Sequence, residues 1–162
     1  MIRKEGIELK TDRLYINKVE QFVEQICDEY NIFTDYYGNI LMSVIEAYTN
    51  AVVHGNHYDE NKHVQIRFES ETNGLAFYVE DEGAGFDVNG VPDPTDINAT
   101  GEEGRGLFTI KALADKVEFL NNGSTIKMTF LISSINHEVA SKRAALYHDY
   151  VGQGVKNNAQ IN

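Results

Sequence analysis

The sequence predicts an α+β fold of two layers, with helices stacked on one face of a mainly antiparallel sheet. Two long segments, residues 14–30 and 34–55, carry apolar side chains at helical spacing. Two pairs of shorter apolar runs are each joined by a turn that contains asparagine and glycine, which is typical of antiparallel hairpins. One layer of helices and one layer of strands therefore account for most of the chain.

The first third of the chain predicts a strand and two helices. Residues 7–10 alternate apolar and charged side chains, which indicates a short strand. The apolar stripe of the first helix consists of Tyr15, Ile16, Val19, Phe22, Val23, Ile26, Cys27 and Tyr30. Thr34 or Asp35 can cap the second helix, and Gly55 is a natural place for that helix to end.

The next hundred residues predict two hairpins, a loop and a third helix. The hairpins comprise strands at 64–68 and 75–79 joined through Asn73-Gly74, and strands at 117–120 and 126–132 joined about residues 121–123. Residues 86–103 lack periodicity and contain both prolines of the chain. A loop of this length inside a compact domain is usually functional or disordered. A helix is expected from about residue 106 to 115.

The length of 162 residues predicts one folded domain. We assign it to residues 1–133. Residues 134–162 are interpreted as a C-terminal extension that is weakly helical over 138–150 and ends in a polar tail.

The composition is that of a globular protein with an acidic surface. Lys and Arg number 14 and Asp and Glu number 25, which gives a formal charge of −11. An acidic surface opposes contact with phosphate backbones, so nucleic acid is not expected as a partner, and a basic protein surface fits better. The single cysteine, Cys27, excludes an intramolecular disulfide and is expected to be a small buried hydrophobe. No signal peptide or membrane span is evident, so a cytoplasmic location is expected.

Three short segments carry the residues that could perform chemistry. In the first, Glu46, Asn50 and His54 follow one another at intervals of four and share a face of an α-helix. The carboxylate of Glu46 can accept a proton, and the amide oxygen of Asn50 can bind Mg²⁺. The same pair could equally occupy the solvated face of an ordinary amphipathic helix, and His54 fits a helix C-terminus.

The second and third segments are weaker signals when taken alone. Asp81 follows an apolar strand and could accept a hydrogen bond from an adenine amino group, while Gly83 and Gly85 allow the backbone to approach a flat base. An ordinary turn has the same composition. Gly104 and Gly106 precede a helix, whose first N–H groups bind phosphate readily, although a glycine pair before a helix is common.

In this order, the segments resemble the N, G1 and G2 boxes of the GHKL ATPase superfamily, which has the Bergerat ATP-binding fold. The resemblance covers about residues 5–132. Its sequences are Glu-Ala-x-x-Asn-Ala-x-x-His-Gly from Glu46, Asp-x-Gly-x-Gly-Phe from Asp81 and Gly-Arg-Gly-Leu-Phe-Thr-Ile from Gly104. They are most similar to those of the bacterial anti-sigma factor kinases.

The resemblance implies a role for each matching residue. Glu46 would be the catalytic base, Asn50 the Mg²⁺ ligand and Asp81 the adenine contact. The other implied ATP contacts are Gly83, Gly85, Gly104, Arg105, Gly106, Leu107 and Thr125, and residues 86–103 would form the lid over ATP. The acidic stretch 101–103 departs from relatives that carry a basic residue there, and Arg105 either replaces that residue or faces solvent or a partner.

The length favours the stand-alone anti-sigma kinase branch. About 33 residues precede the second helix and contain no histidine to accept a phosphoryl group, and about 30 residues after the domain cannot form a further domain. The resemblance therefore implies a homodimeric serine/threonine kinase that uses ATP and Mg²⁺, sequesters a sigma factor and phosphorylates a small STAS-type anti-anti-sigma protein. Two alternatives stay open, namely a nucleotide-gated binding switch without phosphotransfer and an orphan ATPase.

Overall fold

The computed structural model describes residues 4–32, 34–87, 89, 105–132, 145–146, 149 and 152. The chain divides into two compact units, Met1–Leu131 and Ile132–Asn162. In the second unit the four described residues are helical. The assignment of residues 134–162 as an extension without its own activity stays a prediction, and most of the expected lid lies outside the described residues.

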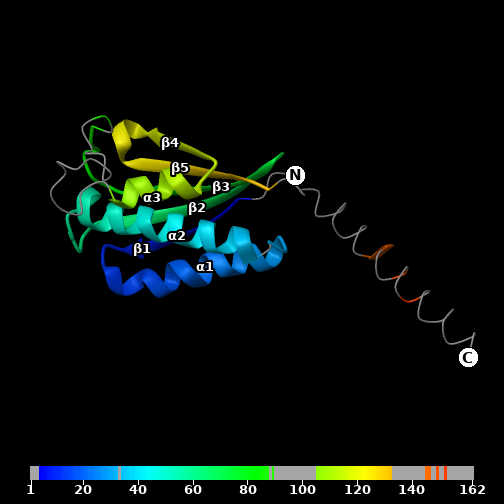
Figure 1. Ribbon diagram of the computed structural model, residues 1–162. Helices are drawn as coiled ribbons and strands as arrows, with labels where there is room; N and C mark the ends of the chain where they lie inside the picture. Colours follow the sequence, from blue (N-terminus) through cyan, green and yellow to red (C-terminus); the bar gives the residue numbers. More distant parts are fainter. Residues whose placement is uncertain are drawn as a thin grey trace, which may run out of the picture. The chain divides into compact units, whose positions relative to one another are not determined.

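The first unit is built on one five-stranded antiparallel sheet with the strand order β1-β2-β3-β5-β4 (Figure 1). The strands are β1 (Lys4–Lys10), β2 (His63–Glu71), β3 (Gly74–Glu80), β4 (Lys116–Leu120) and β5 (Thr125–Leu131). The helices are α1 (Ile16–Glu29), α2 (Thr34–Asn50) and α3 (Arg105–Leu113). The predicted α+β sandwich is confirmed.

The core lies between the sheet and the helices because side chains alternate along each strand. In β2, Val64, Ile66 and Phe68 are buried, whereas the intervening residues carry charged or polar side chains. The register continues this pattern across the sheet, since Phe68 lies opposite Phe77, which in turn lies opposite Met128. From α1 the core receives five residues, Val19, Phe22, Val23, Ile26 and Cys27. Cys27 is buried as expected, and burial raises its pKa to about 12, so the thiol is uncharged.

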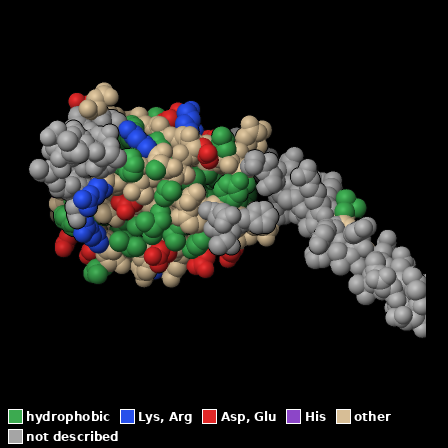
Figure 2. Space-filling model, viewed as in Figure 1, with side chains coloured by type: hydrophobic (Ala, Val, Ile, Leu, Met, Phe, Trp, Pro, Cys, Tyr) green, Lys and Arg blue, Asp and Glu red, His purple; other side chains and the backbone are tan. Residues whose placement is uncertain are grey.

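Charged side chains cover the surfaces that face away from this core. The outer face of the sheet carries ion pairs between neighbouring strands, including Lys127 with Glu71 at 2.7 Å and Lys4 with Glu69 at 3.1 Å. Acidic side chains gather over α1 in Figure 2. The negative charge of the sequence is thus partly displayed on one helix.

The first predicted hairpin is correct in its strands and wrong in its turn. The loop is Thr72-Asn73, and Gly74 is the first residue of β3, paired with Glu71. Gly74 also lies opposite Leu131 of β5, where a Cβ would collide with the carbonyl oxygen of Phe130. Glycine is therefore needed at this position for the close approach of two strands, which turn statistics do not register. The second hairpin turns at Asn121–Gly123 as predicted.

The second predicted helix reaches Gly55 as expected, but its last five residues, Ala51–Gly55, form a π-helix. The alignment of His54 with Glu46 assumed 3.6 residues per turn, so it does not carry over beyond Asn50. His54 is exposed. The side chains of Thr34 and Asp35, the expected caps, lie outside the part of the chain that is described.

The connection from β1 to α1 is fixed by a buried tyrosine on α2. Tyr48 is fully buried, and its hydroxyl donates to the carbonyl oxygens of Lys10 (2.9 Å) and Asp12 (2.8 Å). Burial raises the pKa of Tyr48 to about 12, so the hydroxyl keeps its proton at neutral pH. This contact joins segments 36 to 38 residues apart.

We expect Tyr48→Phe to lower the free energy of unfolding by about 1–2 kcal/mol, because two carbonyl oxygens lose a buried donor. Chemical denaturation followed by circular dichroism measures this loss. Tyr58→Phe is the matched control, since Tyr58 is half exposed and its change should stay within about 0.5 kcal/mol. Equal losses in the two variants would contradict a structural role for the Tyr48 hydroxyl.

Candidate functional site

The first and third segments meet where α3 begins. A Cβ on Gly106 would lie 2.9 Å from Oε2 of Glu46 and 3.0 Å from Oδ1 of Asn50. Real side chains almost never come this close, so only glycine lets the first turn of α3 lie on these two side chains of α2. The carboxylate, the amide and the start of a helix therefore share one location.

The second segment meets the other end of the same long helical element. A Cβ on Gly55 would collide with the carboxylate of Asp81, and one on Gly83 would collide with the carbonyl oxygen of Gly55. Residues 46–55 therefore contact both the Asp81 turn and the start of α3. The three segments that the sequence singled out are brought together along one element.

Asp81 is held by backbone hydrogen bonds on both sides. Its N–H donates to the carbonyl oxygen of Ser124 (2.9 Å), and its Oδ1 accepts from the N–H of Gly83 (2.8 Å). This arrangement leaves Oδ2 to accept a hydrogen bond from a ligand. Burial raises the pKa of Asp81 above its ordinary value, and the hydrogen bond from Gly83 partly opposes that rise.

The turn between β4 and β5 closes the same side of the site. The N–H of Phe86 donates to the carbonyl oxygen of Asn122 (2.9 Å), and the Phe86 ring packs edge-on against Phe119 at 6.0 Å. Gly85, with φ of 81°, lies against the same carbonyl group. Thr125 is 1% exposed, and its hydroxyl accepts from Nδ2 of Asn121 at 3.1 Å. Thr125 pairs with Glu80, so it lies beside the residue that precedes Asp81.

The residues at the start of α3 differ in what they expose. Arg105 is exposed, whereas the side chain of Leu107 is buried in the core. Leu107 could therefore contact a ligand only through its backbone. The first N–H groups of an α-helix have no partner within the helix, which makes this turn suited to an anion. Gly104, also expected here, lies outside the described residues.

The protein donor set fits a metal ion held mainly by a ligand. Across the described part of the chain, no group of three or more His, Cys, Asp or Glu side chains could hold a metal ion. The amide oxygen of Asn50 is a single neutral donor beside the start of α3. Mg²⁺ commonly takes one or two protein ligands and completes its shell with phosphate and water, so Asn50 fits that mode.

Our sequence reasoning missed Asn56. Its side chain is 1% exposed and hydrogen-bonds three separate segments, including the backbone N–H of Glu82 (2.8 Å) next to Asp81. An asparagine after a helix-ending glycine is common at helix ends, so the sequence does not reveal these long-range contacts.

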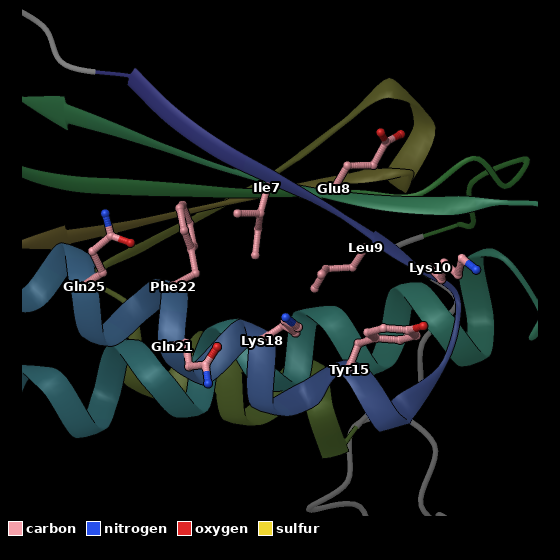
Figure 3. Close-up of a pocket in the computed structure, with 9 residues that line it drawn as sticks. All are labelled: Ile7, Glu8, Leu9, Lys10, Tyr15, Lys18, Gln21, Phe22 and Gln25. Atoms are coloured by element: carbon pink, nitrogen blue, oxygen red, sulfur yellow. The ribbon is translucent and has the colours of Figure 1, made fainter.

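A groove of about 510 Å³ lies elsewhere, between β1 and α1 (Figure 3). Its apolar part includes Ile7 and Leu9 of β1 and Phe22 of α1. None of the three segments lines it. We therefore regard it as separate from the site around Asp81 and Glu46.

Comparison with known proteins agrees with this geometry. Residues 9–130, which include the three segments, match the family described as histidine kinase-like ATPase domain. The chain belongs to this family. Its expected membership of the GHKL superfamily, in the anti-sigma kinase branch, is confirmed, and the family implies ATP as the nucleotide.

Several curated relatives are named serine-protein kinase RsbW. The chain is 28% identical to the protein of Bacillus subtilis over 139 residues, which cover 79% of this chain and 86% of the relative. It is 31% identical to the protein of Halalkalibacterium halodurans over 123 residues, covering 71% and 75%. The protein of Bacillus velezensis is also 31% identical, over 125 residues that cover 71% and 77%. The family member is thus similar to kinases over most of its length. None of the helices in the described residues could cross a membrane.

We expect Gly106→Ala to weaken ATP binding at least tenfold, because the added methyl group must displace Glu46, Asn50 or the start of α3. Gly38→Ala is the matched control. Gly38 is an exposed residue inside α2 with nothing within 4 Å of the added Cβ, so alanine should stabilise the protein by up to about 1 kcal/mol. Isothermal titration and thermal denaturation measure both effects. Unchanged ATP affinity in Gly106→Ala would show that the close approach is not part of the binding site.

We expect Asp81→Asn to raise the melting temperature of the nucleotide-free protein at neutral pH while weakening ATP binding. A carboxyl group with a raised folded pKa destabilises the protein when ionised. This destabilisation is absent below the ordinary aspartate pKa of about 3.9 and complete above the raised value. The stabilisation by asparagine should therefore shrink as the pH falls through that window. A gain independent of pH would contradict this origin.

Proposed function

We propose that the protein is an ATP-dependent serine/threonine kinase that acts as an anti-sigma factor. The observation that supports this most directly is the packing of Gly106 on Glu46 and Asn50. It brings a candidate base, a candidate Mg²⁺ ligand and a phosphate-binding helix start within reach of one terminal phosphate. The similarity to serine-protein kinases supports the same reaction.

Each site residue has a role in this proposal. Asp81 accepts a hydrogen bond from the adenine amino group through Oδ2, while Gly83, Gly85 and Thr125 line the base. The backbone at the start of α3 binds the phosphates, with Gly104 and Arg105 assigned there by resemblance. Asn50 holds Mg²⁺, which when bound neutralises charge on the phosphate oxygens.

Transfer then requires one proton to move and one bond to be exchanged. Glu46 accepts the proton from a serine or threonine hydroxyl of the partner. The hydroxyl oxygen forms a bond to the terminal phosphorus, and the bond from that phosphorus to the bridging oxygen breaks to release ADP. The protein contributes mainly position and electrostatics, as in other phosphoryl transfers.

The proposed partners are a sigma factor and a small STAS-type anti-anti-sigma protein that accepts the phosphoryl group, so that the kinase regulates transcription from the cytoplasm. The proposal also includes a homodimer through β1 and α1. In support, β1 is an edge strand of the sheet, and Ile7, Leu9 and Phe22 line the adjacent groove (Figure 3). Edge strands and apolar grooves are surfaces that proteins tend to cover.

We expect Glu46→Gln to lower the rate of phosphotransfer by about 10²–10⁴-fold and to change ATP affinity by less than about threefold, because only the proton acceptor is lost. Transfer of radiolabelled phosphate from ATP to a STAS-type protein of the same organism measures the rate. Glu60→Gln, an exposed glutamate in the loop before β2, is the matched control.

Wild-type transfer by Glu46→Gln would remove Glu46 from the mechanism. If the wild-type protein binds ATP with Mg²⁺ but transfers no phosphate, the nucleotide-gated switch replaces the kinase. Release of phosphate without a partner would favour the orphan ATPase.

A further inference from the structure

The Asn56 carboxamide lies at a junction between four parts of the fold. Its Nδ2 donates to Oγ1 of Thr11 (2.9 Å) and to the carbonyl oxygen of His63 (3.0 Å), and its Oδ1 accepts from the N–H of Glu82 (2.8 Å). These contacts join the end of the π-helix to the β1–α1 connection, to the start of β2 and to the turn that carries Asp81. Both donors and one acceptor position of the amide are therefore used.

The surroundings define the orientation of this amide. The Thr11 hydroxyl donates its proton to the carbonyl oxygen of Lys62 (2.7 Å), so its oxygen is an acceptor toward Asn56. The His63 carbonyl can only accept, and the Glu82 N–H can only donate. A flipped amide would oppose all three groups. Aspartate could not supply the two donors, and glutamine is longer by one methylene group, so asparagine is the side chain that fits.

The contacts also form a closed ring around the adenine-side turn. Asn56 donates to the carbonyl group of His63, the N–H of His63 donates to Oε2 of Glu82 (2.5 Å), and the N–H of Glu82 donates back to Asn56. Glu82 lies between Asp81 and Gly83, which are themselves joined by a hydrogen bond. The position of the Asp81 carboxylate is thus set from both sides of Glu82.

We propose that Asn56 is a positioning residue for recognition of the base, acting through Glu82 on Asp81. This inference rests on the proposed function in that the ligand of Asp81 is adenine. Without the amide, the buried N–H of Glu82 loses its partner and the turn shifts to recover one. A shift of the order of 1 Å at Asp81 weakens its contact with the base, while the start of α3 still holds the phosphates.

The test compares the binding of ATP and GTP, because the two nucleotides share their phosphates and differ in the base. In Asn56→Ala we expect the preference for ATP over GTP to fall about tenfold, the effect of one hydrogen bond, through loss of ATP affinity. A purely structural role would weaken both nucleotides in proportion and leave the preference unchanged. Asn61→Ala, an exposed asparagine of the same loop, is the matched control and should keep the preference.

Thr11→Val is the second variant, and it decides the matter if Asn56→Ala does not fold. It keeps the shape of the side chain and removes one acceptor of the Asn56 amide, so a loss of about threefold in preference is expected. An unchanged preference in the folded variants overturns the role of Asn56 and leaves the kinase proposal standing. A wild-type protein that binds no ATP overturns the proposed function, and this inference with it.

Discussion

The site depends on how closely the start of α3 approaches α2. Glu46 and Asn50 lie one helical turn apart, and Gly106 packs directly against both side chains. A helix start attracts phosphate wherever it occurs, but it supports transfer only if a proton acceptor and a cation ligand lie at the same phosphate. The missing side chain at residue 106 makes that overlap possible. Leu107 and Ile110, which are buried, hold α3 in this position from the core side.

The long helical element from Thr34 to Gly55 organises both halves of the site. Its α-helical part presents Glu46 and Asn50 toward α3, and its π-helical end lies against the Asp81 turn. The change from α to π at Ala51 alters the direction in which the following residues point, and Asn56 then comes to face Thr11, His63 and Glu82. The π-helix is therefore placed at the boundary between the proposed phosphate and adenine sides, in keeping with the frequent occurrence of such turns at functional sites.

Periodicity was sufficient to predict the layers, because the burial of one face is a property of the sequence itself. The stripe from Val19 to Cys27 and the alternation from Val64 to Phe68 both correspond to buried residues. The failures have a different origin. Gly74 serves a strand 57 residues away and not its own turn, as its partner Leu131 shows, and Asn56 satisfies groups up to 45 residues distant. Contacts of this range leave no trace in local spacing, whereas Glu46, Asn50 and Asp81 were found because their family pattern is local.

The raised pKa of Asp81 indicates how binding and stability are opposed in this fold. A carboxylate placed in a partly buried turn destabilises the free protein, and its neighbour Glu80 adds to the effect. The backbone hydrogen bonds from Gly83 and to Ser124 offset this only in part. Residues that break local rules without an evident structural gain are expected at functional sites. A donor from a bound base would complete the hydrogen bonding of Asp81, so ligand binding should relieve the destabilisation that the empty turn maintains.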